Sequence, residues 1–485
     1  MLDAVIIGAG FAGLGAAIKL KRAGFEKIAV LEKADAPGGT WRDNQYPGAA
    51  CDIPSLLYSY SFAPNPDWSR AYSPAPEINA YIGTMIERYG LNDVIEYGAG
   101  VEALSYQDKT GSWLVQKSDG TTLAARAVIS SAGPFVGGKF PAIEGLDLYQ
   151  GHKIHSAEWD HGYDFKGKRV AVIGTGASAV QIVPELVKQA SLVKVFQRTP
   201  GWVLPRLDME NPDWIKTAFR RSPALQKAAR EALFWVHETM ALGIVWTTPM
   251  TRLLETVARA YLRQTVKDKW LRRQLTPRYR IGCKRVLMTS DFYPALQKDN
   301  CHLITWPIVK LTEKGIRCAE GIEHTFDCIV FATGFDTPMT RLPFAVEGQH
   351  GRTLAQDWAG GAQAYRSVAV AGYPNLFFTL GPNSGPGHNS ALYYMEAQLS
   401  YIVNALKAMR EADVTAITVR HEAQEAFNEK LRMRLSNTNW ASGCSSWYLA
   451  PDGSNPSMFP GFATQFRNQL KEFRWDDYER LGTAA

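Results

Sequence analysis

The chain has 485 residues, of which 46% are hydrophobic and 21% charged, a composition typical of a soluble globular protein with two or three domains. Its 53 lysines and arginines exceed its 47 acidic residues by only six, and this mild excess argues against a nucleic-acid partner. No apolar run approaches the roughly 20 residues that a membrane-spanning helix requires, so we expect no membrane span.

The start of the chain and its cysteines indicate where in the cell the protein is expected. The first predicted strand begins almost at Met1, so we expect no signal or transit peptide. The six cysteines show neither a CxxC motif nor metal-ligand spacing, so we expect no redox-active disulfide and no metal site. We therefore expect a reducing, cytoplasmic location.

A strand, a glycine-rich turn and a helical stretch open the chain. The strand Ala4-Val-Ile-Ile leads into Gly8-Ala-Gly10-Phe-Ala-Gly13, and the next strand, from Ile28, ends at Glu32. Glycines permit the tight turn and let the backbone approach a pyrophosphate at the helix N-terminus. A carboxylate after the second strand accepts hydrogen bonds from both ribose hydroxyls and repels a 2′-phosphate. This pattern predicts a site for the adenosine half of FAD or NAD.

The same pattern recurs later with the opposite charge. The strand from Val170 leads into Gly174-Thr175-Gly176-Ala-Ser178-Ala179, and the next strand, from Leu192, is followed by Arg198. Arg198 and Glu32 both come 24 residues after the first glycine of their motif. A guanidinium pairs with a 2′-phosphate through two hydrogen bonds, so the second site is predicted to bind NADPH. Two such sites in one chain predict a flavoprotein.

The order of elements predicts an α/β fold with two Rossmann-like dinucleotide-binding domains and a helical insertion. Strand patterns stop near Asp208 and return only at Cys301 and Cys328, which makes both nucleotide domains discontinuous. We expect residues 1–145 and 370–485 to form the FAD-binding domain and residues 150–207 and 282–369 the NADP-binding domain. Residues 208–281 form the insertion. A long helix is expected from Ser390 to Arg410.

Between the glycine motifs lies Tyr149-x-Gly151-xxx-His155-xxx-Trp159-Asp160. It resembles the fingerprint of type I Baeyer-Villiger monooxygenases, F-x-G-x-x-x-H-x-x-x-W-P/D, with Tyr149 in place of the usual Phe. The resemblance continues almost end to end, through Gly39-Thr40-Trp41, Tyr46-Pro-Gly48, Asp52, Gln197-Arg-Thr-Pro200, Gly282-Cys-Lys-Arg285, Ala332-Thr-Gly334, Gly381-Pro-Asn383 and Gly387-His388. The family implies that His155 is a hinge and positioning residue, and we assign it no catalytic role.

Arg285 and Asp52 are the expected catalytic residues. In the family, reduced flavin and dioxygen give a C4a-peroxide that attacks a ketone as its anion, and a fixed guanidinium stabilises that anion. Arginine stays a cation throughout. Asp52 is expected to orient Arg285 and to bind the nicotinamide, although a turn carboxylate before Pro54 is the alternative interpretation.

The remaining expected site residues bind the cofactors. Lys284 should face away from Arg285, because neighbours in an extended segment point to opposite sides, and should bind the 2′-phosphate with Arg198 and Thr199. By resemblance, Gly39, Thr40, Trp41 and Tyr46 line the flavin. The resemblance also implies that Trp447 belongs to a mobile loop that closes over NADP, and a core tryptophan is the alternative interpretation.

The resemblance implies an FAD-containing enzyme that uses NADPH and O2 to convert a small-molecule ketone into an ester or lactone. At two places the chain departs from the residues usual in the family, namely Arg42-Asp-Asn-Gln45 and Ala50. These departures leave the substrate class open. The nearest alternative is a flavin-containing monooxygenase that acts on amines or sulfides, and such an enzyme would not need Arg285. A non-catalytic flavin redox sensor is a more distant alternative. The sequence predicts no particular ketone and no oligomeric state.

Overall fold

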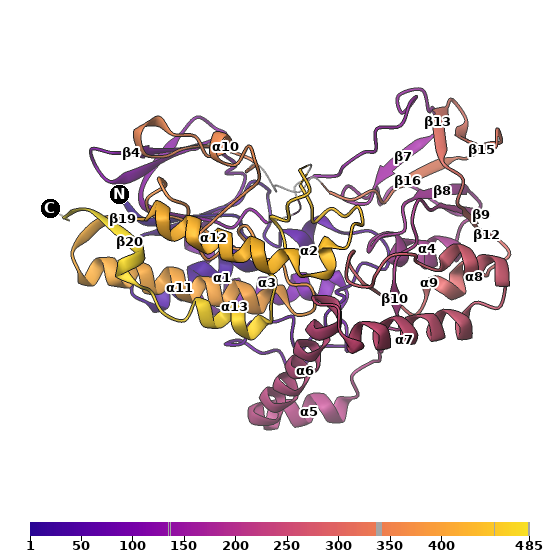
Figure 1. The fold of residues 1–485 in the computed structure, drawn as a ribbon, viewed down its shortest axis with the longest axis horizontal. Coiled ribbons are helices and arrows are strands. Elements are labelled where there is room, and N and C mark those ends of the chain that lie inside the picture. The colour runs from indigo at the N-terminus through magenta and orange to yellow at the C-terminus, as the bar shows by residue number, and fades with distance from the viewer. Residues whose placement is uncertain (134, 136, 336–341, 451, 484–485) are drawn as a thin grey trace.

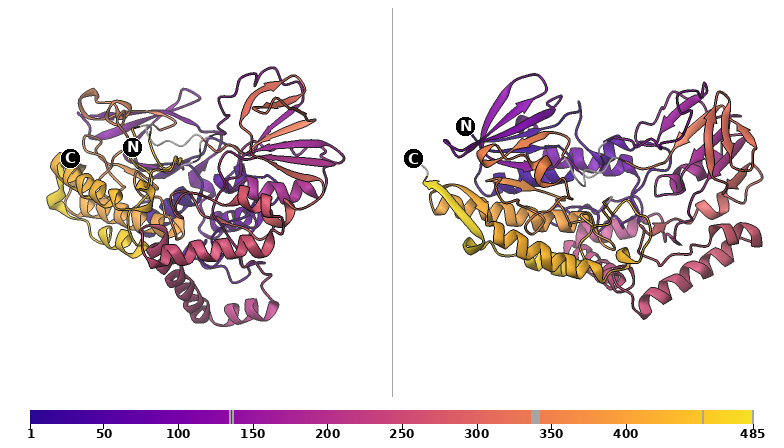
Figure 2. Two further views of the ribbon diagram at one scale, coloured as in Figure 1. Left: turned by 45° about the vertical axis from the view of Figure 1, so that its right-hand side comes forward. Right: turned by 45° about the horizontal axis from the view of Figure 1, so that its top comes forward.

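A computed structural model describes residues 1–133, 135, 137–335, 342–450 and 452–483. Within these ranges, two β-sheets with parallel cores form two separate units, which stand at opposite ends of the molecule (Figure 1). Both chain ends lie on the first unit, on the side away from the second unit, as further views confirm (Figure 2).

The first unit is built on a sheet in which eight described strands run in the order β17-β4-β5-β6-β1-β2-β3, with β18 also paired to β6. The strands are β1 (Leu2–Ile7), β2 (Ile28–Leu31), β3 (Ile95–Glu96), β4 (Val101–Gln107), β5 (Ser112–Lys117), β6 (Thr122–Ser130), β17 (Ala345–Glu347) and β18 (Leu376–Phe378). Strand β1 is apolar on both faces because both faces are covered. Its Ala4 and Ile6 pack on one side of the sheet, and Val5 and Ile7 pack on the other.

The second unit is built on a fully parallel sheet of five described strands in the order β12-β9-β8-β16-β7. The strands are β7 (His152–His155), β8 (Arg169–Ile173), β9 (Leu192–Phe196), β12 (Cys301–Ile304) and β16 (Cys328–Phe331). Val170 and Val172 of β8 pack on one face, and Ala171 and Ile173 pack on the other, where a three-stranded antiparallel sheet covers them. That small sheet consists of β13 (Ile308–Thr312), β14 (Gly315–Cys318) and β15 (Glu323–Thr325).

Helices cover both sheets. Those of the first unit are α1 (Phe11–Arg22), α2 (Thr40–Asp43), α3 (Ala75–Arg88), α10 (Leu354–Asp357), α11 (Ala391–Glu411), α12 (His421–Ser436) and α13 (Ala463–Gln469). Those of the second unit are α4 (Ala179–Val187) and α9 (Phe292–Ala295). Two short pairs complete the strands, namely β10 (Val203–Leu204) with β11 (Leu287–Met288) and β19 (Val414–Val419) with β20 (Tyr478–Thr483). Short 3-10 helices cover Asn92–Val94, Gln349–Gly351, Asn439–Ala441 and Trp475–Asp477.

Four helices separate β10 from β11 along the chain, in the expected insertion. They are α5 (Asp213–Arg221), α6 (Pro223–Ile244), α7 (Pro249–Thr265) and α8 (Lys269–Leu275). Helix α7 runs beneath the second unit, whereas α5 and α6 project below the junction of the two units (Figure 1). Among the described residues, no helix is both long and apolar enough to cross a membrane.

The α/β prediction with two dinucleotide-binding sheets is confirmed. The predicted long helix is also present, as α11, and the Ser390 side chain caps its N-terminus. Strand β17 and helix α10 belong to the first unit, whereas their positions in the sequence predict the second unit. Strand β17 pairs with β4 of the first sheet, although residues 282–369 are expected in the second unit. A single three-residue strand carries no pattern that would reveal its partner.

Candidate functional site

The first glycine turn joins β1 to α1. Gly8 has a φ of +100°, and a Cβ there would lie 2.7 Å from the carbonyl oxygen of Ser131. A Cβ on Gly13 would collide with the carbonyl of Gly8, so these two glycines are required by the backbone itself. Gly10 differs, because the closest described atom to a Cβ there is the Cα of Gly39 at 3.8 Å. Packing therefore leaves room at Gly10, directly before the N-terminus of α1, where a phosphate can approach.

Glu32 lies at this turn, although it follows the neighbouring strand β2. Its side chain is 5% exposed, and its two oxygens accept hydrogen bonds from the backbone N–H groups of Ala9 (2.8 Å) and Ala34 (3.0 Å). Arg42 of α2 pairs with the same carboxylate at 3.0 Å. The carboxylate is thus fixed beside Gly8 and Gly10. Arg42 is a neighbour that the sequence analysis did not connect to Glu32.

Gly39, Thr40 and Trp41 form the start of the short helix α2. Gly39 has a φ of +52°, and its Cα faces Gly10 of the first turn. The Trp41 indole donates a hydrogen bond to the hydroxyl of Tyr58 (3.2 Å) and packs edge-on against that ring. These contacts hold the segment 39–41 against the turn that carries Gly10.

The second glycine turn joins β8 to α4. Gly174 has a φ of +118°, and a Cβ there would collide with the carbonyl of Ala332. Around Gly176, no described atom lies within 4 Å of the Cβ position, so the space before Ser178 and α4 is open. Thr175 lies next to Thr199, to whose carbonyl its hydroxyl donates at 3.4 Å. The second turn therefore repeats the geometry of the first.

Lys284 and Arg198 form a cationic pair beside this turn. The pKa of Lys284 is lowered, first by burial and then by the positive charge of Arg198. Within the described ranges, neither side chain forms an ion pair with an acid. Lys284 also lies over the Tyr279 ring, with its Nζ 5.3 Å from the ring centre. Two unneutralised cations next to an open glycine turn match the charge of a phosphate.

The next residue, Arg285, points to Asp52 of the first unit. Its Nη2 and Nε donate to the same Asp52 oxygen at 2.7 and 3.2 Å, and its Nη1 donates to the carbonyl of Pro386 at 3.3 Å. The Asp52 carboxylate raises the pKa of the Arg285 guanidinium above its ordinary value. Both side chains are about three-tenths exposed, at 29% and 30%. The guanidinium is therefore fixed, charged and accessible.

The loop that leads to Asp52 docks on the second unit. The Tyr46 hydroxyl donates to the Gln181 side chain (3.0 Å), and the Gln181 amide donates to the carbonyl of Ala50 (2.9 Å). A Cβ on Gly48 would lie 2.7 Å from the Gln181 carbonyl, so only glycine permits this approach. Gln181 belongs to α4, the helix of the second glycine turn. The structure thus connects the two turns through a residue that the sequence did not single out.

Trp447 lies in an exposed segment that a disulfide attaches to the site. Cys283 is bonded to Cys444, 161 residues away along the sequence. The absence of a CxxC motif does not exclude such a pair, because the spacing along the chain says nothing about distant cysteines. Trp447 is 47% exposed and packs on Tyr448, with ring centres 4.5 Å apart. It is therefore not a core tryptophan.

The residues of the fingerprint from Tyr149 to His155 pack within the second unit. The Tyr149 hydroxyl donates to the carbonyl of Phe326 (3.0 Å), and a Cβ on Gly151 would collide with the Tyr149 ring. His155 ends β7, is 2% exposed, and accepts a hydrogen bond from the backbone N–H of Ala157 at 3.1 Å. Burial lowers the pKa of His155. These residues hold the second sheet and do not contact Arg285.

A cavity of about 760 Å³ borders the loop before Asp52. Trp41, Tyr46 and Gly48 of the first unit line it, together with Arg206 and Ser290, which follow β10 and β11 along the chain. Asp52 and Arg285 are not among its lining residues. The cavity therefore reaches the docking loop rather than the guanidinium.

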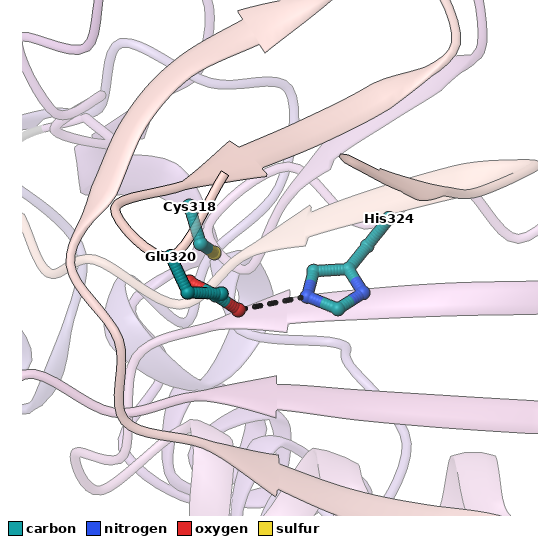
Figure 3. A group of neighbouring side chains, drawn as sticks. All are labelled: Cys318, Glu320 and His324. Atoms are coloured by element: carbon teal, nitrogen blue, oxygen red, sulfur yellow. Dashed lines mark ion pairs between the residues drawn. The ribbon is translucent and has the colours of Figure 1, made fainter. Parts of the chain in front are cut away.

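Cys318, Glu320 and His324 form a separate cluster at the small antiparallel sheet (Figure 3). Their ligand atoms lie within 4.8 Å of one another, but Lys194 places its Nζ 3.0 Å from Nδ1 of His324. When Nδ1 accepts from this ammonium, Nε2 carries the proton and faces Glu320 at 3.5 Å. Burial also raises the pKa of the Cys318 thiol to about 11. A nearby cation, a protonated Nε2 and a neutral thiol all disfavour a metal, so we assign none here.

Comparisons with known proteins agree with this geometry. The pyridine nucleotide-disulphide oxidoreductase family matches residues 5–222. A Baeyer-Villiger monooxygenase of Pseudomonas aeruginosa is 41% identical over 481 residues, which cover 99% of this chain and 91% of that protein.

Two solved structures share the whole fold. An oxidised steroid monooxygenase bound to NADP matches with a TM-score of 0.88 and 29% identity, and it covers 99% of each chain. The structure of OTEMO in complex with FAD and NADP matches with a TM-score of 0.90 and 25% identity, again over 99% of each chain. The chain therefore belongs to the Baeyer-Villiger monooxygenase family of NADPH-dependent flavoproteins.

Proposed function

We propose that the protein is an FAD-containing monooxygenase that uses NADPH and O2 to insert one oxygen atom into a small-molecule ketone, giving an ester or lactone. The observation that carries this proposal is the Arg285–Asp52 pair, a fixed and accessible cation beside the loop that joins the two glycine turns. Oxidation of amines or sulfides needs no such cation, so the pair favours ketones.

The described residues fit both cofactors. Gly8, Gly10 and Gly13 would accept the FAD pyrophosphate, Glu32 its ribose, and the segment with Gly39, Thr40, Trp41 and Tyr46 its ring system. For NADPH, the corresponding residues are Gly174, Thr175, Gly176, Ser178, Arg198, Thr199, Lys284 and Trp447. Bound flavin accepts a hydride from NADPH and activates O2, which no side chain of this chain can do.

Arg285 supplies the electrostatics of oxygen insertion. Negative charge develops on the substrate oxygen as the ketone is attacked, and a cation already fixed in place stabilises that charge without reorganising. Asp52 holds the guanidinium through Nε and Nη2, and Pro386 holds it through Nη1, which leaves its remaining donor capacity for substrate. Asp52 also keeps the guanidinium from turning away toward solvent.

The domain division is part of the proposal. Residues 1–145 and 370–485 form the FAD-binding domain, residues 150–207 and 282–369 the NADP-binding domain, and residues 208–281 the insertion. The pairing of β17 with β4 and the packing of Leu354 of α10 in the core of the first unit support one change, which assigns residues 345–357 to the FAD-binding domain. A cytoplasmic location is also a proposal, and the Cys283–Cys444 disulfide weighs against it because cytosolic disulfides are rare.

Product analysis tests the function directly. Purified protein is incubated with FAD, NADPH, air and a panel of cyclic, linear and aryl ketones, with thioethers and amines in parallel. We expect esters or lactones that depend on NADPH. Turnover of thioethers or amines without any ester would replace the ketone assignment by the heteroatom alternative, and NADPH consumption no faster than in a protein-free blank would favour the redox sensor.

Arg285→Ala tests the observation that carries the proposal. Removing one preorganised donor from an anion-stabilising site costs about 10²–10³-fold in rate, so we expect ester formation to fall by about that factor. Anaerobic reduction of the flavin by NADPH should change little, and the consumed NADPH should appear as hydrogen peroxide. Arg278→Ala, at an exposed position on the same connecting segment, is the matched control. Ester formation by Arg285→Ala at the wild-type rate would remove Arg285 from the mechanism.

A further inference from the structure

Glu238 is a buried carboxylate of the helical insertion that the proposed function does not use. It lies on α6, and its side chain is 3% exposed. Its Oε1 accepts from the backbone N–H (2.8 Å) and the hydroxyl (2.7 Å) of Thr464. Its Oε2 accepts from the backbone N–H of Ala463 at 3.1 Å and lies 3.2 Å from Nε2 of His388. Burial on its own would raise the pKa of Glu238, but hydrogen bonds from His388 and Thr464 hold it at about 2.

These contacts join three segments that are remote in sequence. The insertion supplies Glu238, the loop 385–389 supplies His388 and Asn389, and α13 supplies the backbone donors at its first turn. His237, the residue before Glu238, places Nδ1 3.1 Å from the carbonyl of His388. Two consecutive residues of α6 therefore hold His388. Glu238 contacts its side chain, and His237 contacts its backbone carbonyl.

His388 is oriented by this arrangement. Because Glu238 is an acceptor, Nε2 of His388 carries a proton that it donates to the carboxylate. The His388 side chain is fully buried, and within the described part of the chain Nδ1 has no hydrogen-bond partner. A ring fixed in this way cannot rotate without breaking the contact to Glu238.

The loop held by Glu238 is the loop that contacts Arg285. Pro386 precedes His388 by two residues, and its carbonyl accepts the hydrogen bond from Nη1 of Arg285 at 3.3 Å. We propose that Glu238 is a positioning residue for oxygen insertion, which fixes the loop 385–389 through His388 and thereby the guanidinium of Arg285 through the Pro386 carbonyl. This inference rests on the proposed function, and it assigns a role in that function to the helical insertion.

Glu238→Gln tests the role of the carboxylate with little change of shape. Each oxygen of Glu238 accepts a hydrogen bond from a backbone N–H. The NH2 group of glutamine, at either position, would therefore face one of these N–H donors and could not accept its hydrogen bond. We expect the loop to shift and the ester formed per NADPH to fall on the order of tenfold, with hydrogen peroxide making up the difference. The rate of flavin reduction by NADPH should stay within about twofold of the wild type, because Lys284 and Arg198 are untouched. Glu231→Gln, an exposed carboxylate on the same helix, is the control.

A pair of variants at His388 separates positioning from mere packing. Glutamine can present an amide N–H to Glu238 much as Nε2 of histidine does, whereas leucine fills a similar volume and presents no donor. We expect His388→Gln to keep most of the ester yield and His388→Leu to lose it to the extent that Glu238→Gln does. Equal loss in both His388 variants, or wild-type ester yield in Glu238→Gln, would overturn the proposal.

Hydrogen exchange provides a measurement that does not depend on the reaction. Amides of residues 383–390 should exchange faster in Glu238→Gln and His388→Leu than in His388→Gln, Glu231→Gln and the wild type. Unchanged exchange in the first two variants would refute the positioning role. A wild-type protein that forms no ester at all would refute the proposed function, and the exchange comparison would still decide whether Glu238 positions the loop.

Discussion

At the scale of single residues, we propose that Lys284 and Arg198 determine the choice between NADPH and NADH. The two cations lie close enough for the charge of Arg198 to lower the pKa of Lys284, and an anion between them would relieve this repulsion. NADPH offers the 2′-phosphate that NADH lacks. The preference for NADPH should therefore depend on both side chains.

Lys284→Ala should narrow the preference for NADPH over NADH. A charge-assisted contact to phosphate contributes about 1.5–3 kcal/mol, so the ratio of the two kcat/KM values should fall by about tenfold to over a hundredfold. The loss should come mainly from KM for NADPH, with kcat/KM for NADH nearly unchanged. Lys298→Ala, an exposed lysine on the same unit, should leave the ratio as it is. A wild-type enzyme with equal kcat/KM for both cofactors would contradict the assignment.

Local spacing made some of these residues predictable. Glu32 and Arg198 follow a strand at the same distance from a glycine turn, so their places depend on one βαβ unit each. Gln181 and Glu238 had no such signal. The partners of Gln181 are 131 and 135 residues away, and Ala463 is 225 residues from Glu238, so only the folded chain brings them together.

At the scale of elements, the disulfide joins two segments that are remote in sequence. Cys283 directly precedes Lys284, and Cys444 lies in the exposed segment Ala441–Trp447. Hydrogen bonds of this segment, such as Ser442 to Asn439, are largely local. The bond is therefore a strong link between that segment and Lys284 and Arg285, which we propose bind NADPH and substrate.

Reduction of the disulfide should loosen that segment. In this exchange a dithiol reagent is oxidised to its own disulfide, and Cys283 and Cys444 become thiols. Removing a disulfide typically costs about 2–5 kcal/mol, so we expect a lower Tm, faster proteolysis near residues 441–447 and more hydrogen peroxide per NADPH.

Thiol counting and a double variant check this expectation. Alkylation of the unfolded protein should modify four cysteines before reduction and six after it. The variant with both Cys283→Ser and Cys444→Ser should resemble the reduced wild type and should not respond to the dithiol. Six alkylated cysteines in the untreated protein would show that the bond does not form in solution.

The whole molecule is two sheets that must meet in one relative position. Hydride transfer would require the nicotinamide of the dinucleotide held at one glycine turn to reach the flavin ring of the dinucleotide held at the other, so catalysis would depend on how the units dock. The sequence predicted both units but not their contact, because glycine motifs determine local turns and carry no signal for the partner surface. One part of this contact lies beside the second glycine turn. Tyr46, Gly48 and Ala50 of the first unit meet Gln181 on the first turn of α4.

Gln181→Ala should therefore slow the reduction of the flavin rather than weaken either cofactor. The substitution removes the acceptor of the Tyr46 hydroxyl and the donor to the Ala50 carbonyl, and leaves Glu32, Lys284 and Arg198 in place. A misplacement of about 1 Å can cost 10²-fold in rate, so we expect anaerobic stopped-flow reduction to be at least about tenfold slower. FAD content and the Kd for NADP⁺ should change less than threefold, because each of them depends on one glycine turn and not on the contact between the units. Gln189→Ala, exposed just beyond the same helix, is the matched control. If Gln181→Ala is reduced as fast as the wild type, the contact between Gln181 and the loop before Asp52 does not set the docking of the two units.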